Sequence, residues 1–162
     1  MPQSVTQQHL RHDRFHQKHN VANQLMKTTE LKSNLLNMYV AIALGGIEGK
    51  DLFIPFDAWD CGIKYQGDVF DPAERIDLIW PTVKALKIGC VYDGEGLWLV
   101  SMAETTAGQA EPFLPLQCTD PADGYRIAIV WSVFGSEVPN TFESSLFGTV
   151  DLTEYNHESC KD

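Results

Sequence analysis

Four histidines near the start of the chain are spaced so that they could bind one metal ion. The intervals of three, four and three residues place them on one face of a helix: His9, His12, His16 and His19. Imidazoles one turn apart can chelate Zn²⁺, Ni²⁺ or Cu²⁺, and they could also protonate together below about pH 6.5. The segment is otherwise polar apart from isolated apolar residues such as Leu10 and Phe15, and Asp13 is its one carboxylate. We therefore expect a solvated tail and no cofactor, with an adventitious metal ion, a physiological metal site or a pH switch as alternatives.

The carboxylate of Glu104 continues an apolar strand face. Trp98, Val100 and Met102 precede it at intervals of two, which is the period of a strand. Burial of a carboxylate without a partner is costly, so residues at such positions are often functional. Glu104 is therefore a candidate acid or base, and the alternative is a solvated strand end.

Nucleophilic catalysis has little support in the sequence. No Gly-x-Ser-x-Gly occurs, and a Ser–His or Cys–His pair would need a histidine from the N-terminal segment or His157 near the other end. Gly89, Gly94 and Gly96 surround a predicted hairpin instead of following a strand as in a phosphate-binding loop. The cysteines lack the close spacing of a zinc site or a disulfide scaffold: Cys61, Cys90, Cys118 and Cys160.

Length and hydropathy predict one cytoplasmic domain. The chain has 162 residues, within the range of roughly 100–200 residues for a single domain. Its first residues lack the apolar core of a secretory signal, and no run reaches the ~18 apolar residues of a membrane span. We expect an intracellular protein with free thiols that does not enter a membrane.

Charge is distributed unevenly along the chain. Residues 1–50 hold six Lys/Arg and three Asp/Glu, a net of +3, whereas residues 51–162 hold six and nineteen, a net of −13. A net charge this negative over residues 51–162 repels the phosphate backbones of nucleic acids, which argues against nucleic-acid binding. The acidic surface either serves solubility or fits a basic partner, as in an inhibitor or a mimic of nucleic acid.

The elements that must position these residues divide the chain into three parts. Residues 1–20 are a polar tail or an extra helix, residues 21–155 a single α+β domain, and residues 156–162 a C-terminal tail. Apolar residues follow helical spacing over 21–43, with Thr28-Thr29-Glu30 as a break or a fresh start within it, and Gly45-Gly46 should end that helix. Three shorter elements follow: a turn of helix at 51–56, a strand at 61–66, and a helix that Asp71 and Pro72 begin and Pro81 kinks.

The rest of the chain predicts antiparallel sheet. Strands are expected at 85–92 and 97–106 around a turn at 93–96, with an edge strand at 111–119, where two prolines limit pairing. A turn at 121–124 leads into the segment 125–134, which is apolar on both faces and therefore predicts a central strand. A further strand is expected within 141–155.

Two motifs carry a family resemblance. The first runs from the apolar helix end Tyr39-Val-Ala-Ile-Ala-Leu-Gly-Gly through Glu48-Gly-Lys-Asp-Leu to Phe56-Asp-Ala-Trp, and the second from Asp123-Gly-Tyr-Arg-Ile to Phe134. Over about residues 30–136 the chain resembles NTF2-like proteins of the SnoaL and ketosteroid-isomerase type. The resemblance implies N-terminal helices packed in a strongly curved antiparallel sheet, a cone around an apolar cavity. It also implies a homodimer without a cofactor.

The resemblance suggests candidates for acid/base chemistry in that cavity. Tyr39 falls where ketosteroid isomerases carry a catalytic tyrosine, but neither the position of their base, near Ile63 or Lys64, nor that of their second acid, within 113–116, holds a carboxylate. Steroid isomerisation is therefore not expected. Five residues remain as candidates: Tyr39, Asp57, Asp60, Tyr65 and Glu104. Their alternatives are a core role for Tyr39 and turn or helix-cap roles for Asp57 and Asp60.

Four tryptophans would line a pocket for a flat apolar ligand, or else belong to the core: Trp59, Trp80, Trp98 and Trp131.

These observations lead to two predicted functions. The first is a pocket protein for an apolar, polyketide- or terpenoid-like molecule, and if catalytic a cofactor-free cyclase, isomerase or dehydratase. The alternative is a non-catalytic acidic interaction protein, an inhibitor or immunity-type module, that binds a basic protein partner. A closed cavity with convergent polar groups would favour the first, and a filled core with an acidic face the second.

Overall fold

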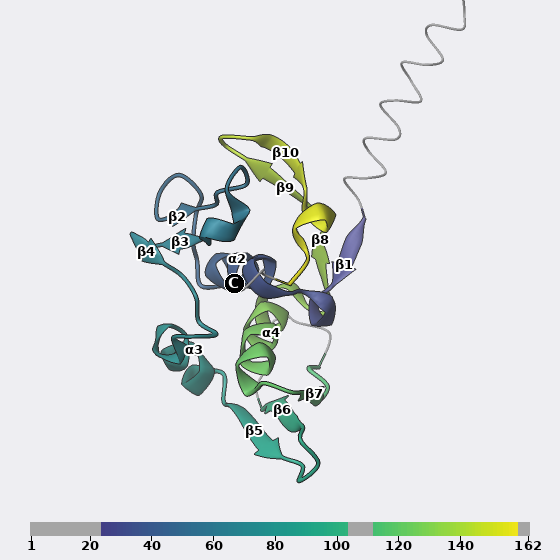
Figure 1. Cartoon of the computed structure of the whole chain (residues 1–162). Helices are drawn as coiled ribbons and strands as arrows, with labels where there is room; N and C mark the ends of the chain where they lie inside the picture. Colours follow the sequence, from purple (N-terminus) through teal and green to yellow (C-terminus); the bar gives the residue numbers. More distant parts are fainter. Residues whose placement is uncertain (1–23, 104–111, 159–162) are drawn as a thin grey trace, which may run out of the picture.

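The structure, a computed structural model, describes residues 24–103 and 112–158. This part of the chain is an α+β arrangement, which confirms the predicted class (Figure 1). Its α-helices are α2 (Ser33–Ala43), α3 (Trp80–Ala85) and α4 (Pro121–Phe134). α2 and α4 pack against each other, and their apolar side chains form the centre of the core. None of the helices in the described part has the length and apolar character that a membrane span requires.

The helix predicted from residue 21 begins only at Ser33. The preceding residues form β1 (Leu25–Lys27), which pairs antiparallel with β8 (Glu137–Pro139), and a 3₁₀ turn (Thr28–Glu30). The bonds to β8 join residues more than one hundred positions apart, so local apolar spacing could not reveal them. The predicted end of the helix is confirmed, because α2 stops at Ala43 and Gly45 adopts a positive φ of 98°.

The segment predicted as a central strand, 125–134, is helical and belongs to α4. Asp120 caps the helix by accepting a hydrogen bond from the backbone N–H of Ala122 at 2.9 Å, and Pro121 occupies the first turn. The predicted turn at 121–124 is that first turn. α4 is apolar on nearly all sides because it packs on α2 and on the sheet beneath it. An apolar run without polar alternation fits a buried helix as well as a buried strand.

α4 approaches its supporting sheet unusually closely at Gly124. A Cβ atom placed on this glycine would lie 2.3 Å from Cγ2 of Val100 and 3.0 Å from Sγ of Cys118. Glycine is therefore required at the contact between the helix and the sheet.

That sheet contains three antiparallel strands in the order β5 (Ile88–Tyr92), β6 (Trp98–Met102) and β7 (Leu116–Cys118). Cys90 pairs with Val100, and Val100 pairs with Leu116. The strands and the turn between them confirm the hairpin predicted around 93–96, although β5 begins at Ile88 and not at residue 85, which ends α3; β7 confirms an edge strand within 111–119. β6 ends at Met102, so Glu104 lies outside the described residues.

The other strands form separate small sheets. β2 (Leu52–Phe53), β3 (Lys64–Tyr65) and β4 (Asp68–Val69) make one, and β9 (Thr141–Ser144) with β10 (Gly148–Asp151) makes a hairpin. β3 lies within the strand predicted at 61–66, and the hairpin lies within 141–155. The described strands thus form four sheets, and no strongly curved sheet around helices is seen among them.

Two further predictions need correction. Residues 52–53, predicted as part of a helical turn, extend into β2, because they pair with β3. The helix expected at Asp71 starts instead at Trp80, after a turn in which the carbonyl of Asp71 accepts the N–H of Arg75 at 2.9 Å. Pro81 consequently lies in the first helical turn, where its missing N–H costs nothing, and does not kink a longer helix.

Candidate functional site

Tyr39 is a core residue in the structure. Its side chain is 3% exposed, its hydroxyl donates to the carbonyl of Pro139, and its ring meets Phe134 edge-on with centroids 5.4 Å apart. Burial raises the pKa of the phenol above its ordinary value near 10. A phenol that is buried, bonded to backbone and harder to ionise is poorly suited to proton transfer, so its core alternative fits this geometry.

The other predicted catalytic residues do not converge with Tyr39. Asp57 and Asp60 are exposed, and neither caps the 3₁₀ turn (Trp59–Cys61) beside them. Tyr65 is half-buried and packs edge-on against Phe70, with ring centroids 5.5 Å apart. Asp57 lines a surface cavity together with Phe56. Glu104 and the four N-terminal histidines lie outside the described residues.

The four tryptophans lie at separate places in the structure. Each packs against an aromatic ring in a different place, and the ring centroids lie 4.8–6.4 Å apart. Their partners are Phe56 and Tyr155 for Trp59, Tyr125 for Trp80, Tyr92 for Trp98, and Phe113 for Trp131. Trp59 belongs to a larger aromatic cluster.

This cluster joins the segment after β2 to the C-terminal hairpin. Phe56 lies at its centre, stacked on Trp59 at 5.7 Å with an interplanar angle of 6°. Three rings from the C-terminal part surround Phe56 with centroid distances of 5.2–6.0 Å: Phe142 on β9, Phe147 in the hairpin turn and Tyr155. The Tyr155 hydroxyl also reaches the carbonyl of Phe56 at 3.4 Å. Segments almost one hundred residues apart in sequence are thereby held together.

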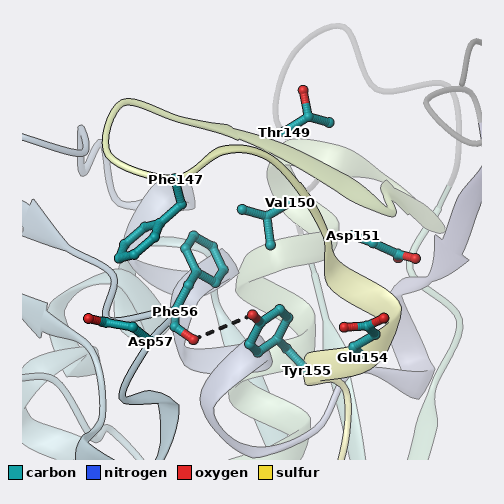
Figure 2. A pocket seen from close by; sticks show the side chains of 8 residues that line it. All are labelled: Phe56, Asp57, Phe147, Thr149, Val150, Asp151, Glu154 and Tyr155. Atoms are coloured by element: carbon teal, nitrogen blue, oxygen red, sulfur yellow. Dashed lines mark hydrogen bonds between the residues drawn. The ribbon is translucent and has the colours of Figure 1, made fainter.

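A surface cavity of about 370 Å³ opens over this cluster. We call it the aromatic groove; Figure 2 shows its eight lining residues, Phe56, Asp57, Phe147, Thr149, Val150, Asp151, Glu154 and Tyr155. Three of the eight are carboxylates and none is basic. Sequence reasoning found Asp57 but placed it in a different kind of pocket. It missed the other seven, although aromatic residues recur at Phe142, Phe147 and Tyr155 in a segment predicted only as a strand.

Glu48 positions the hairpin that forms one wall of the groove. Its carboxylate accepts hydrogen bonds from Oγ of Ser144 at 2.9 Å, from Oγ of Ser145 at 2.8 Å, and from the backbone N–H of Ser145. Oγ of Ser144 in turn accepts the N–H of Phe147 at 3.1 Å. These bonds hold the turn in which Phe147 lies against Phe56.

The 3₁₀ turn Leu152–Tyr155 forms the opposite wall. Asp151 starts this turn, because its Oδ1 accepts the backbone N–H of Thr153 at 3.0 Å and the hydroxyl of the same residue at 2.7 Å. Leu152 anchors the turn in the core, fully buried. Glu154 and Tyr155 are thereby presented to the groove.

A second cavity, of about 400 Å³, lies at the N-terminal ends of α2 and α4 around the buried guanidinium of Arg126. Arg126 donates to Oδ1 of Asn37 at 2.8 Å and to the carbonyl of Ala122 at 3.2 Å, and it forms an ion pair with Asp123. Its acidic neighbours therefore neutralise a buried cation and cap α4. Within 24–103 and 112–158, no three His, Cys, Asp or Glu side chains are placed to hold a metal ion.

The described cysteines are free, as predicted, and two of them lie under α4. Sγ of Cys90 is hydrogen-bonded to the hydroxyl of Tyr125 at 2.9 Å. Burial raises the pKa of the Cys118 thiol, and burial together with the bond to Cys90 raises the pKa of Tyr125 to about 12. A thiol whose pKa is raised is a poor nucleophile at neutral pH. Cys61 is exposed, and Cys160 lies outside the described residues.

Comparison of the chain with protein-family models, with curated proteins and with solved structures finds no match. The geometry of the aromatic groove is therefore the main basis for a function.

Proposed function

We propose that this protein is a non-catalytic interaction module that binds a basic protein partner through the aromatic groove. The observation that carries the proposal is the composition of the groove, in which aromatic rings and three carboxylates meet and no basic side chain lies among them. Carboxylates pair with Lys and Arg side chains, and aromatic faces attract the same cations at about 0.5–2 kcal/mol per contact. Lys and Arg side chains can therefore interact favourably with both the carboxylates and the aromatic rings of the groove.

The surroundings of the groove favour a protein partner. Phe147 is 40% exposed and its neighbour Leu146 is 65% exposed, so the hairpin turn presents apolar surface beside the carboxylates. Aromatic anchors surrounded by polar residues are typical of the energetic centres of protein interfaces. The net charge of −13 over residues 51–162 would attract a basic partner over a longer range.

The first prediction from the sequence, a cofactor-free cyclase, isomerase or dehydratase, becomes the second candidate here, together with the NTF2-like cone and the homodimer that the resemblance implies. It would need several acid/base groups facing one enclosed cavity. In the described part Tyr39 is bonded inside the core, and Asp57 faces an open groove. This arrangement gives the interaction module the stronger support.

Titration with a synthetic peptide tests the proposal. We would use a 12-residue peptide of alternating Lys and Gly, with a Glu–Gly analogue as the charge control, and compare Phe147→Ala with Phe53→Ala. The two phenyl groups are 40% and 45% exposed, but Phe53 does not line the groove. Phe147→Ala should weaken binding of the Lys peptide about fivefold or more, as loss of an interface anchor does, and Phe53→Ala should leave it unchanged. Equal effects of the two variants, or no binding of the Lys peptide, would rule out the aromatic groove as the site.

A further inference from the structure

The carboxylates of the aromatic groove lie at its two ends. Figure 2 shows Asp57 beyond Phe56 and Phe147 on one side, and Asp151 and Glu154 on the other, with the aromatic rings between them. Each end is attached to one member of an aromatic pair. Asp57 follows Phe56 and Glu154 precedes Tyr155 in the sequence, and the hydroxyl of Tyr155 donates to the carbonyl of Phe56 at 3.4 Å. The accessible rings of Phe147 and Tyr155 thus lie between two negative ends.

Both ends have a carboxylate available to a ligand. Asp57 and Glu154 are exposed, and neither forms an ion pair within the part of the chain that the structure describes. Asp151 is partly engaged, because its Oδ1 accepts two hydrogen bonds from Thr153. Asp151 keeps its charge, but Asp57 and Glu154 have more acceptor capacity left for a ligand, and we take these two as the contact points of the two ends.

We propose that the aromatic groove binds a segment in which an apolar side chain is flanked by two basic side chains on the same face. This inference rests on the proposed function and specifies which side chains of the partner the groove would bind. Each basic group would lie against one carboxylate end, and the apolar group would cover the accessible rings of Phe147 and Tyr155.

Other ligands fit this arrangement less well. A wholly apolar group would shield the carboxylates from water without giving them a partner, which is costly. A single cation would satisfy one end only. Two adjacent cations would crowd together at one end and leave the rings uncovered. The separation of the two ends therefore selects for the order of the residues as well as for their charge.

Two peptides of identical composition test this order. In an extended chain, residues i, i+2 and i+4 face the same side. Acetylated and amidated Gly-Ser-Lys-Ser-Leu-Ser-Lys-Ser-Gly therefore presents Lys, Leu and Lys together, whereas Gly-Ser-Lys-Lys-Ser-Leu-Ser-Ser-Gly does not. We expect NMR titration to show that the spaced peptide binds about tenfold more tightly, which corresponds to ~1.4 kcal/mol. Binding of 1,5-diaminopentane as tight as that of the spaced peptide would overturn the peptide assignment in favour of a small diamine.

Charge-neutralising variants assign the preference to the two ends of the groove. Asp57→Asn and Glu154→Gln should each reduce binding of the spaced peptide to the level of its isomer. The matched controls Asp60→Asn and Glu95→Gln, both exposed and outside the groove, should keep the tenfold preference. Binding that depends on Phe147 but shows no preference for residue order would overturn this inference and leave the proposed function standing. Binding that does not depend on Phe147 would overturn both.

Discussion

At the scale of single residues, the hydroxyl of Tyr39 links α2 to the strand pair β1–β8. It donates to the carbonyl of Pro139 inside the core, and burial keeps the phenol neutral. The raised pKa makes this contribution dependent on pH. Below about pH 10 the phenol is neutral in both the folded and the unfolded chain. Above that pH the unfolded chain releases the proton first, so the folded chain binds more protons and its stability falls as the pH rises.

Tyr39→Phe should therefore lower the stability of the protein at neutral pH, and this loss should become smaller at alkaline pH. At pH 8 we expect the variant to be about 1 kcal/mol less stable than the natural protein, since one buried hydrogen bond is lost. Above pH 10 the difference should shrink by up to ~1.4 kcal/mol per pH unit, because only the natural protein carries the ionisation at this position. Urea unfolding at pH 8 and pH 11 measures both values. A difference that stays constant between the two pH values would contradict the assigned burial of the phenol.

At the scale of elements, the contact of α4 with β6 depends on the missing side chain of Gly124. Gly124→Ala should destabilise the protein by about 1–3 kcal/mol, although alanine is the better helix former, because the added methyl overlaps Val100. Thermal or urea unfolding measures the change. Gly89→Ala on β5 is the control, since its methyl would meet no atom within 4 Å. Adding Val100→Ala to Gly124→Ala should recover part of the loss, and strict additivity of the two changes would argue against a direct clash.

The hairpin β9–β10 depends in the same way on one side chain from another element. Glu48→Ala removes the acceptor for Ser144 and Ser145, and we expect faster hydrogen exchange across 141–151 and a loss of about 1.5–3 kcal/mol in stability. Binding of basic peptides should weaken as well, since Phe147 lies in this turn. Glu143→Ala is the control on the same hairpin, where the carboxylate bonds only the exposed Thr149. Equal exchange rates in the two variants would show that Glu48 does not hold the turn.

The elements also show where local sequence is informative. The hairpin of β5 and β6 follows from alternation on both sides of an Asp-Gly-Glu-Gly turn, which is a local signal. The run from Tyr125 to Phe134 carries no such signal, because burial on several sides removes the polar positions that would distinguish a period of 3.6 from a period of 2. The cap at Asp120 and Pro121 was the available indication of a helix, and Asp71 with Pro72 shows that the same pattern also occurs in a turn.

At the scale of the whole molecule, the acidic charge should govern how fast a basic partner arrives. Between 20 mM and 500 mM NaCl we expect the association rate of the Lys–Gly peptide to fall about tenfold or more, with a smaller change in the dissociation rate. Phe147→Ala should do the reverse, since short-range anchors act mainly on dissociation. Stopped-flow fluorescence measures both rates. An association rate that does not respond to salt would contradict steering by the acidic body.

The sequence by itself determined the α+β class, the acidic charge of residues 51–162 and the β5–β6 hairpin, because composition and short-range alternation carry these properties. The candidate site was decided by the tertiary structure. Phe56, Phe147 and Tyr155 meet only after the chain has folded back over nearly one hundred residues, and Glu48 and Asp151 then fix the two walls. The same packing placed Tyr39 in the core. Contacts between distant segments leave no periodic trace in the sequence, so Asp57 could be selected as a polar residue but not assigned to this groove.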